Sequence, residues 1–140
     1  MTLDPYNLER FVKAQAPVYE TVRQELEAGR KTSHWVWFIF PQITGLGRSA
    51  MAERFAITSL EEAKAYLDHP LLGPRLRACV RLVNSVRGRS ISQILGHPDD
   101  LKFGSSMTLF ARAATDTAIF EEALNTFFGG SEDQATLERL

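Results

Sequence analysis

The chain has 140 residues, 44% of them hydrophobic and 24% charged, which suits one hydrophobic core and excludes a disordered or fibrous protein. Its net charge of −1 gives no support to nucleic-acid binding, and no apolar run approaches the roughly 20 residues of a membrane span. The N-terminus lacks a signal-peptide pattern, and the single cysteine, Cys79, cannot form an internal disulfide. We therefore expect a cytoplasmic protein that has no membrane partner.

Helical patterns dominate the chain from the N-terminus onward. Asp4-Pro5 can start the first helix, and Pro17 can start the second. Ser59 and Glu62 have capping-box spacing, and residues 71–87 carry the broad apolar stripe of a buried helix. The predicted helices are 5–15, 17–29, one from residue 50, 59–69, 71–87, a short turn over 90–96, 99–114, 116–128, and one after 131.

The absence of strand patterns in the sequence also indicates the fold class. No region alternates polar and apolar residues between hairpin turns, so a sheet is not expected; only Trp35–Phe40 could be a short buried strand. The sequence has no repeat or long linker. It predicts an all-α, single compact multi-helix domain over residues 1–140, with more than half of the residues helical.

The segment Ser33–Ser49 (SHWVWFIFPQITGLGRS) combines large aromatic side chains with polar ones. Core packing explains Trp35 and Trp37 in large part. It does not explain why His34 and Gln42 flank them, since buried polar groups need partners and a ligand is one kind of partner. We expect this segment to line the largest polar concavity, with His34 or Gln42 exposed to it.

The turn Gly45-Leu46-Gly47-Arg48-Ser49 precedes a helical pattern, and Ser49 can cap it. Free amides at a helix start attract anions, so Arg48 together with Arg75 or Lys102 predicts a phosphate site. Residues 71–112 carry seven basic side chains against two acidic ones, a net of +5, whereas residues 113–140 carry one against six, a net of −5. These segments could instead attract each other or be simply solvated.

The segment from Asp99 to Thr108 is the second polar concentration, with Lys102, Ser105 and Ser106 around a glycine. A serine nucleophile would need a positioned base, and helix capping with hydroxyls bonded to backbone carbonyls explains these residues slightly better. The three histidines lack metal-ligand spacing, so neither a metal nor a cofactor is predicted. Cys79 lies in an apolar stripe and is expected in the core.

A set of motifs runs along almost the whole chain: Arg10-Phe11, Ala14-Gln15, Tyr19, Ser33-His34-Trp35, Trp37–Gln42, Gly45–Ser49, His69-Pro70, Leu72-Gly73, Arg75-Leu76, Asp99, Lys102 and Ser105–Phe110. Through these motifs the chain resembles an uncharacterised bacterial family, domain of unknown function 1810. The resemblance implies an all-helical fold and no established activity; its occasional label, calpastatin, does not fit this globular composition. A remoter similarity, through Phe11, Ala14 and Gln15, is to the NADAR N-glycosidases.

Taken together, the sequence predicts a protein that binds a phosphorylated nucleotide or sugar. Trp35 and Trp37 would stack on a base while the cations hold phosphate. If the protein is an N-glycosidase, a carboxylate such as Asp68 or Asp99 would stabilise the cationic sugar or activate water. The alternative is a non-catalytic protein-interaction module with an aromatic core. Neither catalysis nor the oligomeric state is predicted.

Overall fold

The fold is built from helices. The computed structural model describes residues 4–140, and this part of the chain contains no strand, only an isolated parallel bridge between Ile43 and Ile57. The all-α prediction is confirmed. In chain order the helices are α1 (Glu9–Gln15), α2 (Tyr19–Glu27), α3 (Val36–Ile39), α4 (Ala50–Arg54), α5 (Leu60–Asp68), α6 (Leu72–Asn84), α7 (Ile91–Leu95), α8 (Asp99–Ala113), α9 (Ala118–Phe128) and α10 (Gln134–Leu137).

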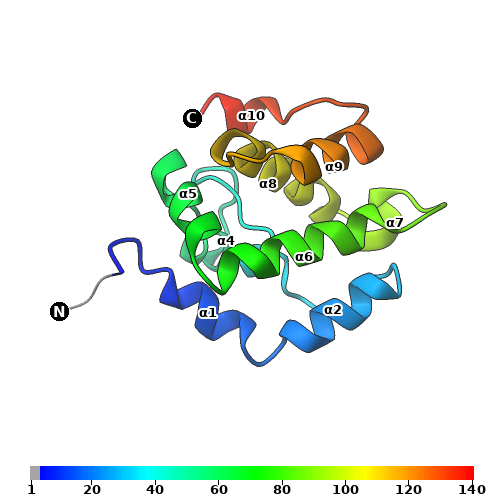
Figure 1. Cartoon of the computed structure of the whole chain (residues 1–140), viewed down its shortest axis with the longest axis horizontal. Coiled ribbons are helices and arrows are strands. Elements are labelled where there is room, and N and C mark those ends of the chain that lie inside the picture. Colours follow the sequence, from blue (N-terminus) through cyan, green and yellow to red (C-terminus); the bar gives the residue numbers. More distant parts are fainter. Residues whose placement is uncertain (1–3) are drawn as a thin grey trace.

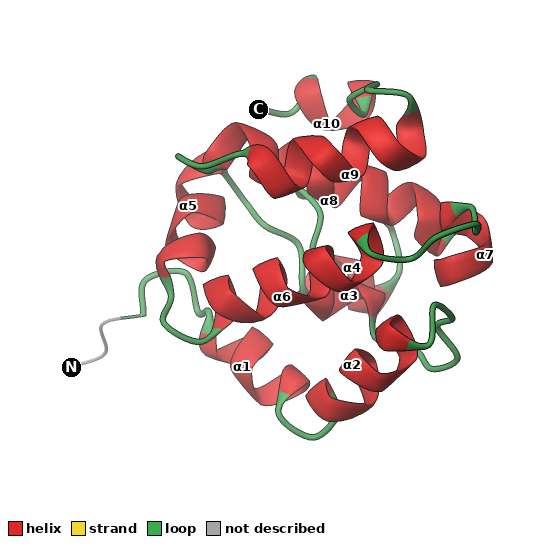
Figure 2. Ribbon diagram, turned by 45° about the vertical axis from the view of Figure 1, so that its right-hand side comes forward, coloured by secondary structure: helices red, strands yellow, loops and turns green. Residues whose placement is uncertain are grey.

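Helices α6 and α8 occupy the middle of the molecule. Figure 1 shows α6 crossing the centre, with α9 and α10 on one side of it and α1 and α2 on the other. Helix α8 packs against α5, α7, α9 and α10, and α6 packs against α2, α5 and α9. Figure 2, turned by 45°, shows helices joined by loops throughout the described chain. The polar segment at the start of α8 is thus carried by a central helix.

Aromatic rings dominate the core. Phe103 of α8 meets the ring of Phe40 edge-on with centroids 4.9 Å apart, and Phe11 of α1 meets Tyr66 of α5 at 5.1 Å. These side chains are fully buried. Burying a large aromatic side chain is among the strongest stabilising terms available to a small domain, so these contacts tie α8 to the end of α3 and α1 to α5.

Side chains cap several helix starts. The Asp4 carboxylate accepts from the Leu8 and Glu9 amides, at 2.7 and 3.0 Å, which satisfies two free donors at the start of α1. Ser59 accepts from the Glu62 amide, as predicted. The reciprocal half of that capping box is absent because the Glu62 carboxylate binds Thr58 and Arg10 instead.

The structure differs from the sequence-based expectations in two local places. The Trp35–Phe40 segment forms the short helix α3 rather than a strand. Helix α6 ends at Asn84, before Gly88. Within residues 4–140 no helix combines the length and hydropathy that crossing a membrane requires. The expectation about a signal peptide involves residues 1–3, which lie outside the described part of the chain.

Candidate functional site

Three of the predicted ligand-binding residues meet in one surface groove. Gln42 comes from the loop after α3, whereas Lys102 and Ser105 come from one face of α8. The glycine turn contributes Gly47. We call this hollow, of about 270 Å³, the Lys102 groove; its lining residues are Gln42, Leu46, Gly47, Pro98, Leu101, Lys102, Ser105, Asp133 and Ala135.

Close packing accounts for the two glycines of the turn. A Cβ atom on Gly47 would lie 2.5 Å from the Ala52 Cβ, so only glycine lets the turn fold against α4. Gly45 has a φ of +93°, in the region that favours glycine, and a Cβ there would lie 2.8 Å from the Arg139 Nε. Ser49 caps α4 as predicted. Because α4 has only five residues, its start provides little of a helix dipole for an anion.

Lys102 is the cation of the groove. Its Nζ lies 5.3 Å from the ring centroid of Trp37 and 3.5 Å from the Asp99 Oδ1. The other Asp99 oxygen, Oδ2, is 2.8 Å from the Nζ of Lys31, whose side chain is only 6% exposed. Two lysines therefore share one carboxylate, which leaves a net charge of +1. Lys102 has the longer contact and the more exposed side chain, so it is the lysine that can meet a ligand.

Asp133 is the anion of the groove, and its binding partners limit its chemistry. Its Oδ2 accepts from the Ser105 hydroxyl at 3.0 Å and from the Thr136 hydroxyl at 2.6 Å. These contacts hold the start of α10 against α8. Ser105 therefore faces a carboxylate already engaged in capping, and within residues 4–140 no histidine is hydrogen-bonded to Ser105 or to Asp133. This geometry favours the capping interpretation of Ser105 over that of a nucleophile.

The two tryptophans differ in burial and in their contacts. Trp35 is 1% exposed, and its indole nitrogen donates to Glu25 at 3.0 Å. The predicted stacking role of Trp35 is wrong, because its ring has no open face. Trp37 is half-buried with its ring beside the Lys102 Nζ, although it is not among the lining residues of the groove. Ser106 is also fully buried, and its hydroxyl has no hydrogen-bond partner in the described chain, so it cannot contact a ligand at the surface.

The other predicted site residues lie elsewhere. The expected anion site joins Arg48 with Arg75 or Lys102. The Arg75 guanidinium lies instead over the Tyr19 ring at 4.5 Å, on the α2 side of α6, whereas Lys102 lines the groove together with Gly47 of the glycine turn. Arg48 and His34 are exposed and are not among the lining residues of the groove. Asp68 lines two other hollows, one beside the Asp4 loop and one beside the α8–α9 loop.

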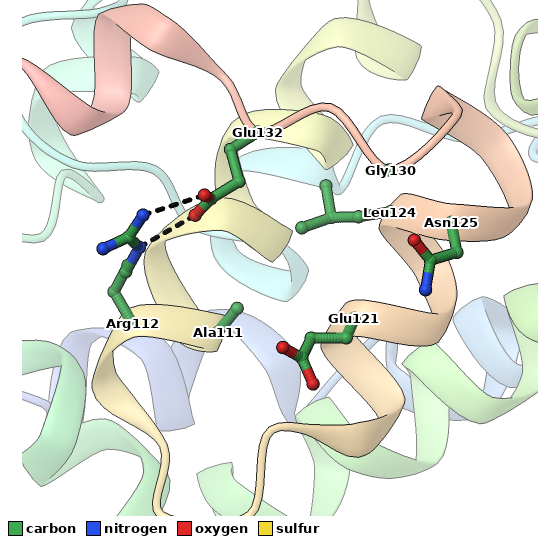
Figure 3. A pocket seen from close by; sticks show the side chains of 7 residues that line it. All are labelled: Ala111, Arg112, Glu121, Leu124, Asn125, Gly130 and Glu132. Atoms are coloured by element: carbon green, nitrogen blue, oxygen red, sulfur yellow. Dashed lines mark hydrogen bonds and ion pairs between the residues drawn. The ribbon is translucent and has the colours of Figure 1, made fainter.

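Larger hollows than the Lys102 groove exist. One, of about 460 Å³, lies between α8 and α9, and no predicted site residue lines it. The expectation that Ser33–Ser49 lines the largest concavity is therefore wrong. Figure 3 shows Arg112 turned toward Glu132, with Glu121 and Asn125 on the other side. Both Arg112–Glu132 hydrogen bonds measure 2.8 Å, and this pair joins the basic segment to the acidic one.

Two further predicted features concern reactive groups. Burial raises the pKa of Cys79 to about 12, despite a hydrogen bond with Tyr19, so the thiol stays protonated at neutral pH and is inert. Across residues 4–140, no three His, Cys, Asp or Glu side chains are grouped so that they could hold a metal ion.

The chain is similar to known proteins along almost its whole length. Residues 5–140 match the family described as protein of unknown function (DUF1810). The chain belongs to this family. The DUF1810 chain is also similar to a solved structure, the conserved hypothetical protein Rv1873 from Mycobacterium tuberculosis. The two share 59% identity over 98% of each chain, with a TM-score of 0.97.

These matches confirm the resemblance to DUF1810 and the helical fold, and they bring no activity with them. The comparison with curated proteins found no match. The likeness to the NADAR N-glycosidases gains no support from them and stays a prediction. For a DUF1810 protein, function must therefore be argued from the groove itself.

Proposed function

We propose that this DUF1810 protein binds a small phosphorylated compound, a nucleotide or a sugar phosphate, in the Lys102 groove. One observation carries the proposal: Gln42 and Lys102, which belong to segments about 60 residues apart, line the same hollow beside the half-buried ring of Trp37. A concave site with a few convergent polar groups and an apolar wall is the usual form of a small-molecule site.

The groups present suit a phosphoryl group next to a hydroxylated skeleton. Lys102 can turn from Asp99 toward a phosphate because Asp99 keeps its closer partner, Lys31, at 2.8 Å. The Gln42 amide offers both donors and an acceptor for sugar hydroxyls or base edges. Leu46 and Leu101 supply apolar wall, and the Leu101 side chain is 58% exposed. The carboxylate of Asp133 suits ligand hydroxyls, which can donate to it.

A Lys102→Gln variant should bind phosphorylated ligands roughly ten- to a hundredfold more weakly, since a charge-assisted hydrogen bond contributes about 1.5–3 kcal/mol. The measurement is calorimetric titration with nucleoside monophosphates and sugar phosphates, first ranked by thermal stabilisation. A ligand at 100 times its dissociation constant should add about 2.7 kcal/mol to the free energy of unfolding.

Two matched comparisons make this test specific. Lys13→Gln removes an exposed lysine on α1, remote in sequence from the groove, and should leave affinity unchanged. The corresponding nucleosides and sugars without phosphate should bind the wild type as weakly as they bind Lys102→Gln. Equal affinity of wild type and Lys102→Gln for every phosphorylated compound would remove the groove as the site.

Hydrolysis of an N-glycosidic bond remains the finer prediction. Of the two candidate carboxylates, Asp99 is the better placed because it contacts Lys102. Both of its oxygens are paired with lysines, so it could face a cationic sugar only after Lys102 turns to the phosphate. Asp99→Asn would then abolish release of the free base from a ribosylated nucleotide, measured by chromatography, while binding persists.

The alternative function is a protein-interaction module. The exposure of Leu101 at the groove favours it, because a large apolar side chain in a concave surface is a common anchor point. This alternative predicts no stabilisation by any small phosphorylated compound, and the same ligand screen therefore separates the two functions.

A further inference from the structure

We propose a second anion site, for the phosphate of an organic phosphomonoester, in the hollow between the α6–α7 loop and the end of α9. This hollow, the Arg87 hollow, has a volume of about 390 Å³ and shares no residue with the Lys102 groove. Its lining residues are Val86, Arg87, Gly88, Arg89, Ser90, Ile91, Ser92, Thr126 and Phe127.

Two acid-free stretches of the chain meet here. Residues 28–52 and residues 69–98 contain no aspartate or glutamate. The Arg89 Nε donates to the Gly29 carbonyl at 3.0 Å, and the Lys31 amide donates to the Ile94 carbonyl at 2.7 Å. Figure 1 shows the α6–α7 loop and the turn after α2 at the same end of the molecule. Lys31 is paired with Asp99, but three arginines of these two stretches, Arg30, Arg87 and Arg89, have no carboxylate partner in the described chain.

Several arginines near this end have no carboxylate partner. Arg30, Arg81 and Arg87 are exposed and make no ion pair with any described residue. Carboxylates occur in the walls of the four other hollows we compared, including the Lys102 groove. The Arg87 hollow has none. It thus has two guanidinium groups and no fixed anion.

Two hydrogen bonds to backbone carbonyls fix the position of the Arg89 guanidinium. Its Nε and Nη2 donate to the carbonyls of Gly29 and Gln93, at 3.0 and 2.9 Å, which fixes the guanidinium at the wall of the hollow. A guanidinium has five N–H donors, so three remain. Because a fixed side chain loses little conformational entropy on binding, it binds phosphate more favourably than a mobile one. Arg87, without such contacts, can close over the ligand.

The other lining residues indicate what kind of organic group carries the phosphate. The hydroxyls of Ser92 and Thr126 are exposed and can donate to phosphate oxygens. Val86 and Phe127 are half-buried and form an apolar wall beside the arginines. An aromatic or aliphatic phosphomonoester satisfies both kinds of surface, whereas inorganic phosphate satisfies only the polar one.

Phenyl phosphate is the probe that tests this site. In an NMR titration of the labelled wild-type protein it should shift the amide signals of residues 86–92 and of Thr126 and Phe127. Arg87→Gln should weaken its binding by roughly tenfold or more, as expected for the loss of one charge-assisted contact. Arg81→Gln removes another exposed, unpaired arginine and should change affinity less than twofold. Phenol and inorganic phosphate should each bind more weakly than phenyl phosphate.

The outcomes separate this site from the Lys102 groove. Lys102→Gln should leave the shifts at residues 86–92 intact even if the proposed function fails. Shifts confined to residues outside the Arg87 hollow would overturn the inference. So would equal losses in Arg87→Gln and Arg81→Gln, which would indicate general charge attraction, or equal affinity for phenyl phosphate and inorganic phosphate.

Discussion

Replacing Arg10 with alanine should lower the free energy of unfolding by about 3–5 kcal/mol, the usual cost of leaving a buried charge without its partner. The Arg10 Nη2 lies 2.9 Å from the Glu62 Oε2, and the Glu62 side chain is only 2% exposed. The same guanidinium donates to four backbone carbonyls within 2.6–2.9 Å, those of Tyr6, Asn7, Arg54 and Ala56. It therefore joins the start of α1 to the α4–α5 connection.

Urea unfolding at pH 7 is the measurement. Lys13→Ala is the matched control, since Lys13 is an exposed cation on the same helix, and it should change stability by no more than about 0.5 kcal/mol. A loss below 1 kcal/mol for Arg10→Ala would show that water replaces the guanidinium at Glu62. The account of how α1 is attached would then be wrong.

The second large effect is a loss of stability in acid that depends on Glu25. Burial by itself would raise the pKa of Glu25. Four hydrogen bonds outweigh it and lower the pKa from 4.5 to about 2: from the Ser33 hydroxyl, the Thr32 and Ser33 amides, and the Trp35 indole. A carboxylate whose pKa is lower in the folded state stabilises the fold above pH 4.5. That contribution, about 3 kcal/mol, is lost as the pH falls from 4.5 through 2.

Glu25→Gln keeps the shape of the side chain and one oxygen for the Thr32, Ser33 and Trp35 donors. The variant should therefore be less stable at pH 7 and show a flatter dependence of stability on pH between 4.5 and 2 than the wild type. Glu20→Gln, on the exposed face of the same helix, should keep the wild-type slope. Unfolding free energies at pH 7, 4.5 and 2.5 would decide; parallel curves for wild type and Glu25→Gln would rule out this role.

The helices could be predicted because their signals are local. Ser90 and Gln93 make a complete capping box across three residues, and Gly129 ends α9 in a left-handed conformation, with φ of +62°. The end of α6 could not be predicted from the local sequence, because Ser85–Gly88 contains no residue that forbids another helical turn. Just beyond that end the Val86 side chain lies close to Gly29 of the turn after α2, a contact between distant segments that the local sequence does not show.

The candidate site was predictable only in part. The sequence indicates Gln42 because it flanks an aromatic run, and Lys102 and Ser105 because they belong to the polar segment 99–108. The fold brings these three residues together in the groove. Nothing in the local pattern shows that Trp35 is buried while Trp37 is partly exposed. The Trp35 indole, unlike that of Trp37, donates to Glu25, which lies ten residues upstream. Asp133 and Lys31 were missed for the same reason, because their partners lie 28 and 68 residues away in the sequence.

The most direct test of ligand binding in the Lys102 groove is a crystal structure of the wild-type protein with the phosphorylated compound that stabilises it most. We expect the phosphoryl group about 2.8 Å from the Lys102 Nζ, the distance typical of a charge-assisted hydrogen bond, with Gln42 contacting the same molecule. Asp99 should keep its contact with Lys31 and lose the one with Lys102. A phosphoryl group bound away from Lys102, or a groove left empty beside a ligand bound elsewhere, would contradict the proposed function.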